Sequence, residues 1–342
     1  MEKAVVSIII SNELEVFTNI QEKVKQIFEE GTADNTIKAY TKDVSYFFAW
    51  ATLVLGREVS EPPVSKELLV KFIIDHLTGL DPHVDESLVA RKLKASLGTH
   101  SVTTVARRVT ALSAMHRLKG TEPNPCTDKQ VTALLSKARK RAVKKGNKPN
   151  KKKAATLDKL DVMLETCDDS LAGIRDRALL LFAFSSGGRR ASEVSGAVVE
   201  NLTQVGDNFV YLISKSKTDQ EGKGHVVPIK GRAADALRKW LEAADINDGN
   251  IFRGITRHGY LTEGFKRVAI SRMIKGRAED AGLNPEDFAS HSMRSGFVTE
   301  GGRQKKHLAS VMALSGHKTV SVAMGYFQAG AVLENEAGNL AG

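Results

Sequence analysis

The sequence predicts a mainly α-helical protein with one small antiparallel sheet. Apolar residues recur every three or four positions over most of the chain, which is the period of an amphipathic helix. One pair of neighbouring segments has strand character instead, and a basic run broken by glycine and proline divides the chain. At 342 residues the chain also exceeds the roughly 100 to 200 residues of one domain. We therefore expect a helical first domain and an α+β second domain.

The first half has the pattern of a small helical domain. Between residues 11 and 30 apolar side chains recur at steps of three and four, and Gly31 follows as a stop. A second helix begins near Asn35 and places Val44 and Phe47 on one face. This half contains no convincing strand. Further helices are expected at residues 65–77, 102–118 and 128–143.

The second half combines helices with a strand pair. Strands are expected at residues 209–213 and 225–229, where apolar and β-branched residues follow a turn at residues 206–208. A third strand is expected at residues 197–202. The helices of this half are expected at residues 157–165, 174–185, 233–243 and 265–281, with shorter pieces toward the C-terminus.

The basic run marks the boundary between the halves. Gly146 and Pro149 interrupt the helical period there, and the lysines repel one another, so this segment should be extended. The predicted parts of the chain are an N-terminal extension at residues 1–33, a helical domain at 34–143, a basic linker at 144–155, and a second domain with a C-terminal tail at 156–342.

Clustered positive charge is the most informative feature of the composition. Ten lysines and arginines lie between Lys137 and Lys153 with no acidic residue among them, and their number equals the formal net charge of +10. Such a run is often a solvated linker. Binding to a polyanion is the sharper interpretation, because phosphate backbones favour clustered Lys and Arg by releasing counterions.

Other features of the composition restrict the class of protein. Cys126 and Cys167 lie far apart and match no metal-ligand spacing, so neither a disulfide framework nor a zinc site is expected. The apolar run at residues 4–10 continues into Glu13 and lacks a small-residue cleavage site, so no secretion signal is expected. No apolar stretch approaches the ~18 residues of a membrane span. We expect a soluble, cytoplasmic protein without a metal or another cofactor.

Arg190 belongs to the first of three motifs that suit chemistry at a phosphodiester. Such chemistry needs positive charge at the non-bridging oxygens, a nucleophile, and a proton donor for the leaving oxygen. Arg190 follows the turn Ser-Ser-Gly-Gly-Arg, where its fork could face a phosphate and Glu193 could orient it. No Lys-Ser or Lys-Thr follows these glycines, which rules against a nucleotide P-loop. Alone, the motif is also typical of a surface arginine.

Two further motifs follow in the second half. His291 and Arg294 are three positions apart, so one helical turn brings both near one face. His317 follows Ser-Gly and precedes Tyr326 by nine residues. Each pattern is common by chance, and an isolated tyrosine usually packs in a core. The second half shows no convincing cluster of carboxylates of the kind that holds catalytic metal ions.

Taken in order, these motifs resemble the tyrosine recombinase family, especially its Cre-type members. The family pattern is an Arg with an acid three residues on, a Lys on a β-hairpin, His-x-x-Arg, and then Gly-His or Gly-Trp nine residues before a Tyr. Lys217 best matches the hairpin lysine, with Lys215 and Lys223 as competitors. Two positions depart from the pattern: Ser295 stands where many members have His, and His317 stands where Cre has Trp.

The resemblance implies a site-specific DNA recombinase that acts through a 3′-phosphotyrosyl intermediate, without metal or ATP. Tyr326 would be the nucleophile, Lys217 the acid for the departing 5′ oxygen, and His291 an aid to proton transfer. The other catalytic side chains would stabilise charge on the phosphate. The implied catalytic residues are Arg190, Lys217, His291, Arg294, His317 and Tyr326, with Glu193 in support.

The resemblance also implies how DNA would bind. Residues 34–143 are similar to the family's core-binding domain, and residues 156–342 to its catalytic domain. The implied partners are double-stranded target sites and further copies of the chain, in a homotetramer whose C-terminal tails dock in trans. A bacterial, phage or plasmid setting is implied. The residues expected at DNA are Lys38, Lys42, Arg107, Arg108, Arg139, Arg141, Lys151, Lys152 and Lys153.

Other interpretations stay open at this point. A type IB topoisomerase or a hairpin-forming telomere resolvase uses similar residues, although the short N-terminal half favours a recombinase. A DNA-binding regulator would have the helices and the basic run but would do no chemistry. A metal-dependent nuclease is a further alternative.

Overall fold

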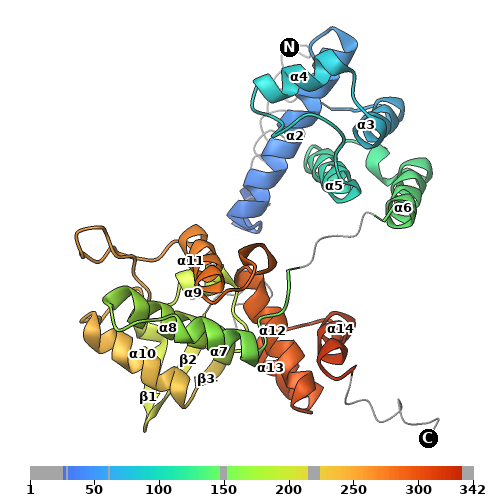
Figure 1. Ribbon diagram of the computed structural model, residues 1–342. Coiled ribbons are helices and arrows are strands. Elements are labelled where there is room, and N and C mark those ends of the chain that lie inside the picture. The colour runs from blue at the N-terminus through green and yellow to red at the C-terminus, as the bar shows by residue number, and fades with distance from the viewer. Residues whose placement is uncertain (1–25, 28–29, 61, 147–151, 215–223, 333–342) are drawn as a thin grey trace, which may run out of the picture. The chain divides into compact units, whose positions relative to one another are not determined.

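The chain consists of two compact units. Contacts divide it into a first unit at residues 1–149 and a second unit at residues 150–342, so the division falls inside the predicted basic linker. The helix expected at residues 11–30 lies almost wholly outside the described residues. The computed structural model describes residues 26–27, 30–60, 62–146, 152–214 and 224–332 (Figure 1).

The described part of the first unit is helical, as the periodicity predicts. Its core forms around Phe47, Trp50 and Phe72, whose ring centroids lie 5.0–5.6 Å apart. The helix at residues 82–90 was not predicted, since Val84 and Leu88 are the only apolar residues on its buried face. The elements are α2 (Asp34–Leu55), α3 (Lys66–Thr78), α4 (Pro82–Ala90), α5 (Val102–Leu118), the 3-10 helix η1 (Pro125–Thr127) and α6 (Lys129–Lys144).

The second unit contains the small antiparallel sheet. Its strand order is β1-β2-β3, and β2 pairs with β3 from Phe209 opposite Ile229 to Ile213 opposite His225. The third strand was expected at residues 197–202, which is wrong: residues 199–201 form a 3-10 turn and the strand begins at Leu202. The elements that form the sheet are β1 (Leu202–Val205), β2 (Asn208–Ile213) and β3 (His225–Ile229), after the 3-10 helix η2 (Val199–Asn201).

Helices cover this sheet and carry the candidate site. Helix α8 is buried almost all round, because it packs against α10, β3 and α12. No helix among the described residues is long and apolar enough to cross a membrane. The helices are α7 (Leu157–Glu165), α8 (Leu171–Ser185), α9 (Ala191–Ser195), α10 (Arg232–Ala243), α11 (Arg267–Asp280), the 3-10 helix η3 (Pro285–Asp287), α12 (Ser290–Arg303), α13 (Leu308–Ser315) and α14 (Val320–Gly330).

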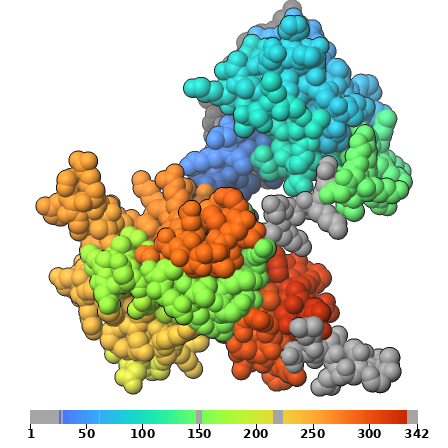
Figure 2. Space-filling view, in the orientation of Figure 1, coloured from blue at the N-terminus to red at the C-terminus, as the bar shows by residue number. Residues whose placement is uncertain are grey.

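A loop at residues 254–264 projects from the second unit, coloured orange in Figure 2. It is closed by an antiparallel bridge between Ile255 and Leu261 and by a hydrogen bond from Thr256 N to Tyr260 O of 2.9 Å. The Tyr260 side chain at its tip is 73% exposed. The loop therefore has a defined backbone but buries little of its own surface.

Glycines let α12 approach its neighbours closely. A Cβ on Gly302 would lie 2.0 Å from the Phe327 carbonyl oxygen, and one on Gly330 would lie 1.9 Å from that of Thr299. On another part of the helix, a Cβ on Gly296 would lie 2.0 Å from the Ala155 carbonyl oxygen. Helix α14 and the segment before α7 are thus packed on the backbone of α12, which fixes what these elements carry.

Candidate active site

The turn before Arg190 is shaped by two glycines with positive φ. Gly187 has φ +99° and Gly188 has φ +73°, a region that glycine adopts without the Cβ penalty of other residues. A Cβ on Gly188 would lie 2.4 Å from Arg294 Cα, and one on Gly187 would lie 2.3 Å from the Leu314 carbonyl oxygen. The turn therefore packs directly on α12 and on the last turn of α13.

Glu193 holds Arg190 at the start of α9. Its carboxylate accepts a hydrogen bond of 3.1 Å from the Arg190 backbone N–H and one of 2.7 Å from Arg190 Nη1. The Glu193 side chain is only 7% exposed, whereas that of Arg190 is 28% exposed. The orienting contact predicted for this pair is thus present, and the guanidinium still reaches the surface.

Helix α12 supplies His291 and Arg294. Arg294 is 3% exposed, and its Nη1 donates a 3.3 Å hydrogen bond to the Gly188 carbonyl oxygen. Burial, followed by the positive charges of Arg190 and Arg189, lowers the pKa of Arg294 to about 10, so it stays cationic at neutral pH. His291 is exposed. Partial burial of its ring, followed by the positive charges of Arg294 and Arg190, nevertheless lowers its pKa.

His317 stands just beyond α13. Gly316 ends that helix with φ +67°, and His317 Nδ1 lies 2.7 Å from the Ser315 hydroxyl oxygen. Burial and then the charges of Arg294 and Arg190 lower the pKa of His317 to about 4. The imidazole is therefore neutral at physiological pH, with one of its ring nitrogens bonded to Ser315.

Tyr326 is half-buried on α14, which packs against α12. It is close enough for its phenolate charge to act on the pKa of Arg294. The charges of Arg190 and Arg294 also act on both histidines, so these five side chains share one electrostatic site. The structure thus brings together five of the six residues predicted to be catalytic.

Arg189 belongs to the same cluster, and sequence reasoning did not identify it. It is 4% exposed, and its Nη2 donates to the Leu314 carbonyl oxygen. Beside Arg190 in the sequence it looks like an ordinary surface cation, so no local pattern signals its burial. Among the described residues, it gives with Arg190 and Arg294 three guanidinium groups against the one carboxylate of Glu193. Such an excess of positive charge suits an anion with two negative oxygens.

The predicted hairpin lysine, Lys217, lies outside the described residues, as do its competitors Lys215 and Lys223. The strand ends that flank them are described: β2 ends at Ile213 and β3 begins at His225. The two strands of the expected hairpin are therefore present. The role of the lysine remains a prediction.

Five of the residues expected at DNA lie on the surface of the first unit: Lys38, Lys42, Arg107, Arg139 and Arg141. Arg108 differs, because it is 6% exposed and its guanidinium stacks 3.2 Å above the ring of Tyr46. Its Nε is 3.5 Å from Asp43 Oδ1, and Asp43 also accepts a hydrogen bond from Arg107. The DNA contact predicted for Arg108 would require this buried group to leave the core.

The end of the basic run is bound to the approach to α12. Lys153 Nζ lies 2.7 Å from Asp287 Oδ2, and its backbone N–H donates 2.8 Å to the Asp287 carbonyl oxygen. Lys152 Nζ is 3.7 Å from Glu286 Oε2. Lys151 lies outside the described residues. Lys152 and Lys153 are thus engaged in ion pairs, and their predicted contact with DNA stays a prediction.

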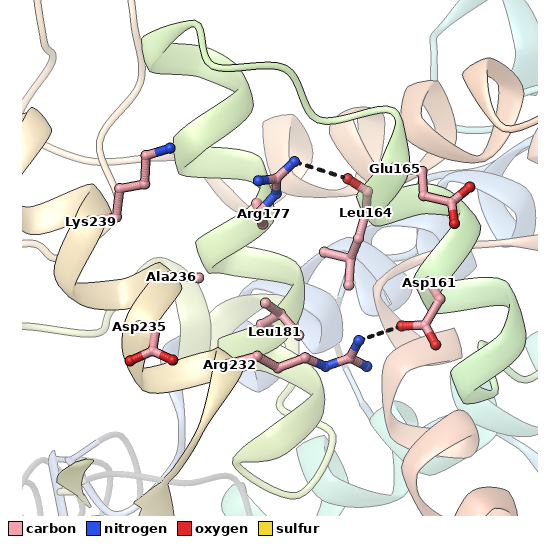
Figure 3. A pocket seen from close by; sticks show the side chains of 9 residues that line it. All are labelled: Asp161, Leu164, Glu165, Arg177, Leu181, Arg232, Asp235, Ala236 and Lys239. Carbon is pink, nitrogen blue, oxygen red and sulfur yellow. Dashed lines mark hydrogen bonds and ion pairs between the residues drawn. The ribbon is translucent and has the colours of Figure 1, made fainter. Parts of the chain in front are cut away.

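A separate hollow of about 640 Å³ lies between α7, α8 and α10 (Figure 3). Two cationic side chains of its lining are bonded to other lining residues. Arg232 bonds Asp161 at 2.6 Å, and Arg177 bonds the Leu164 carbonyl oxygen at 3.5 Å. Its lining has three basic and three acidic residues, so it has no charge excess for a phosphate. None of the predicted catalytic residues that the structure describes lines it. The lining residues are Asp161, Leu164, Glu165, Arg177, Leu181, Arg232, Asp235, Ala236 and Lys239.

Known proteins share this sequence pattern and fold. The sequence profile of the phage integrase family matches residues 153–331. An integrase/recombinase xerD homologue of Selenomonas ruminantium is 31% identical over 327 residues, which are 93% of this chain and 88% of the homologue. In fold, the chain is similar to the Tn1549 transposon integrase in complex with transposon right end DNA: TM-score 0.58, 13% identity, 92% of this chain and 97% of that one.

A second solved structure with this fold is a lambda integrase dimer bound to a COC′ core site. The TM-score is 0.56 at 15% identity, with 91% of this chain and 94% of that chain covered. At such identities the two structures establish the fold alone, whereas the family profile and the Selenomonas homologue establish descent. The chain belongs to the phage integrase family.

Proposed function

We propose that this chain is a site-specific DNA recombinase that cuts and rejoins DNA strands through a covalent bond between phosphate and Tyr326. One observation carries the proposal: Arg190, Arg294, His291 and His317 share one electrostatic site, and α14, which carries Tyr326, packs against the helix that holds two of them. The family membership supports the reaction class. It favours a recombinase over a topoisomerase, a telomere resolvase or a regulator without chemistry.

The first step is transfer of the phosphoryl group to tyrosine. The Tyr326 phenol oxygen attacks the scissile phosphorus, the bond to the 5′ oxygen breaks, and a 3′-phosphotyrosyl ester forms. His291 takes up the phenol proton, a role that suits an imidazole whose lowered pKa leaves it neutral. Lys217 protonates the departing 5′ oxygen. The ester conserves the bond energy, so a 5′-hydroxyl of a second duplex can reverse the step without ATP.

Charge on the phosphate is stabilised by the fixed donors around it. Arg190 and Arg294 bind the non-bridging oxygens, and Glu193 keeps the Arg190 fork in place before DNA arrives. If the Ser315 hydroxyl donates to His317 Nδ1, the imidazole proton is on Nε2, which can then donate to the phosphate. These groups need little reorganisation as charge develops, because burial and neighbouring backbone hold them.

Exchange between two duplexes requires four such sites, and we propose that four copies of the chain supply them as a ring on DNA. Head-to-tail contacts of this kind are heterologous and must close. The C-terminal tail, whose residues 333–342 lie outside the described part, is proposed to dock on the neighbouring subunit. Ending the chain after Val332 keeps every described contact of α14. Such a protein should cleave a single site but fail to form the two-site complex on native gels.

The reaction itself is tested with a nicked duplex. Selection of bound fragments from a random-sequence pool first supplies the target site. A nick next to the scissile phosphate then lets the short fragment that carries the freed 5′-hydroxyl diffuse away, so that it cannot reverse the step. We expect an SDS-resistant protein–DNA adduct, and recombinant products when two intact sites are supplied. DNA binding without any adduct would indicate a DNA-binding regulator that does no chemistry. Adducts with plasmid relaxation but no exchange between sites would indicate a topoisomerase.

A further inference from the structure

Arg189 joins three parts of the candidate site from a buried position. Its Nη2 donates to the Leu314 carbonyl oxygen and, at 3.5 Å, to that of Gly187. Its Nη1 lies 3.7 Å from Glu193 Oε2, the oxygen that also accepts the hydrogen bond from the Arg190 backbone N–H. One side chain therefore contacts the turn before α9, the first turn of α9 and the end of α13.

The contact with Leu314 caps a helix from outside. Leu314 is in the last turn of α13, where carbonyl groups have no partner within the helix and where a cation is favoured by the helix dipole. Gly187 packs on the same carbonyl so closely that a Cβ would lie 2.3 Å from it. His317 follows three residues later and is bonded to Ser315. The cap thus fixes the stretch of chain that ends in His317.

Burying the Arg189 guanidinium for packing alone would cost folding free energy. It is 4% exposed, and its Nε has no hydrogen-bond partner among the described residues. Buried charged groups without full hydrogen bonding cost free energy, and an apolar side chain of similar size would avoid that cost. The position is next to Arg190, and the Arg189 charge also contributes to lowering the pKa of Arg294 and of His317. These facts argue that the guanidinium serves the site.

We propose that Arg189 is a positioning residue: by pairing with Glu193 and bonding the end of α13, it fixes the place of His317 relative to Arg190, so that His317 addresses the phosphate that Arg190 binds. This inference rests on the proposed function of the site. Arg189 itself would not touch DNA. It acts through His317, whose place relative to Arg190 depends on a bond between two elements that are 125 residues apart in the chain.

The test is a double-mutant cycle with His317. Arg189→Leu removes the bonds and the charge at similar volume, and we expect adduct formation on the nicked duplex to slow about tenfold, the loss typical of a buried charged hydrogen bond. DNA affinity should stay within about twofold, because Arg189 faces no phosphate. In a His317→Ala background the same change should have little further effect, since the two residues act as one unit. Additive losses would overturn the proposal.

A matched control separates positioning from stability. Arg175 is also buried, at 8% exposed, and bonds Asp176 on α8 away from the site. Arg175→Leu should lower the melting temperature while leaving the cleavage rate of the folded protein unchanged. If Arg189→Leu fails to fold, Arg189→Lys serves instead, with a smaller loss that again vanishes in the His317→Ala background. Normal cleavage by Arg189→Leu would overturn the inference, whereas absence of adduct in the wild type would overturn the proposed function.

Discussion

Arg294 donates a hydrogen bond of 3.3 Å from Nη1 to the carbonyl oxygen of Gly188. The bond joins α12 to the turn that precedes Arg190, so the two arginines proposed to bind phosphate are positioned by one piece of backbone. Gly188 makes this contact possible, because its φ of +73° and its lack of a Cβ let the turn approach Arg294 Cα. The geometry of the anion site therefore depends on a residue that has no side chain.

Gly188→Ala should damage both stability and cleavage. Its Cβ would meet the backbone of Arg294 at 2.4 Å, which no rotamer change can relieve. We expect a loss of about 3 kcal/mol in unfolding free energy, from steric overlap and positive φ together. Gly206→Ala is the matched control, since Gly206 has φ +59° and open space around it; we expect about 1 kcal/mol there and normal cleavage. Equal effects of the two changes in denaturant titrations would refute the clash.

The first unit should lose stability in mild acid because of His76. This residue is fully buried, and burial lowers its pKa to about 3. As the pH falls below about 6.5, the unfolded chain binds a proton that the folded chain rejects, so stability falls until the pH reaches the folded pKa. From pH 7 to pH 5 we expect a loss of about 2 kcal/mol from this group. Trp50 fluorescence during urea unfolding, in a Trp240→Phe background, measures it.

His76→Gln supplies the comparison for that measurement. Its side chain does not titrate, so the dependence on pH between 7 and 5 should become shallower even if the protein is less stable at both values. His100, whose pKa burial and nearby cations lower to about 4, contributes in the same direction and remains in the variant. An unchanged pH dependence would show that His76 is not the group responsible.

Neutralising the end of the basic run should weaken binding to every DNA sequence. With Lys151, Lys152 and Lys153 changed to Gln, we expect the salt dependence of affinity to flatten by about 0.9 for each phosphate that these lysines bind in the wild type. A matched control changes three paired cations of α10, Arg232, Arg238 and Lys239, and should keep the slope. A normal slope with reduced stability in the first variant would mean that Lys152 and Lys153 serve only Glu286 and Asp287.

Lys217 should be dispensable when the leaving oxygen is replaced by sulfur. A thiolate departs without a proton, so Lys217→Ala should cleave a 5′-bridging phosphorothiolate far better than the ordinary phosphodiester. Lys215→Ala and Lys223→Ala should show little difference between the two substrates. The measurement is the ratio of adduct formation rates for the two DNAs. Selective rescue of one of those other variants would move the general acid to that lysine.

Local sequence patterns predicted most of the fold. Apolar periodicity indicated the long helices and the β2–β3 pair, since those patterns reflect burial on one face. Helix α4 has only Val84 and Leu88 as buried apolar residues, which is too few to show a period. The residues at 197–202 have strand-like composition, but Val199 to Asn201 turn because Val199 N–H bonds the Gly249 carbonyl in a distant loop. That contact is tertiary, and no local pattern contains it.

The candidate site was predicted as a set of residues with Glu193 in support, whereas its buried arginine and its long-range ion pairs were not predicted. Motif order was sufficient to select Arg190, His291, Arg294, His317 and Tyr326. Burial of an arginine, in contrast, depends on what packs over it, so the buried positions of Arg189 and Arg108 could not be read from neighbouring residues. For the same reason the ion pair of Lys153 with Asp287 was not foreseen, because the partners are 134 positions apart in the sequence.

The central claim is that Tyr326 forms the covalent bond to DNA, and adduct formation by Tyr326→Phe on the nicked duplex tests it most directly. Tyr260→Phe, at an exposed tyrosine of the same unit, is the control and should behave as the wild type. We predict that Tyr326→Phe binds DNA with unchanged affinity and yields no SDS-resistant adduct. An adduct formed by Tyr326→Phe at the wild-type rate would contradict the claim and assign the covalent bond to another group.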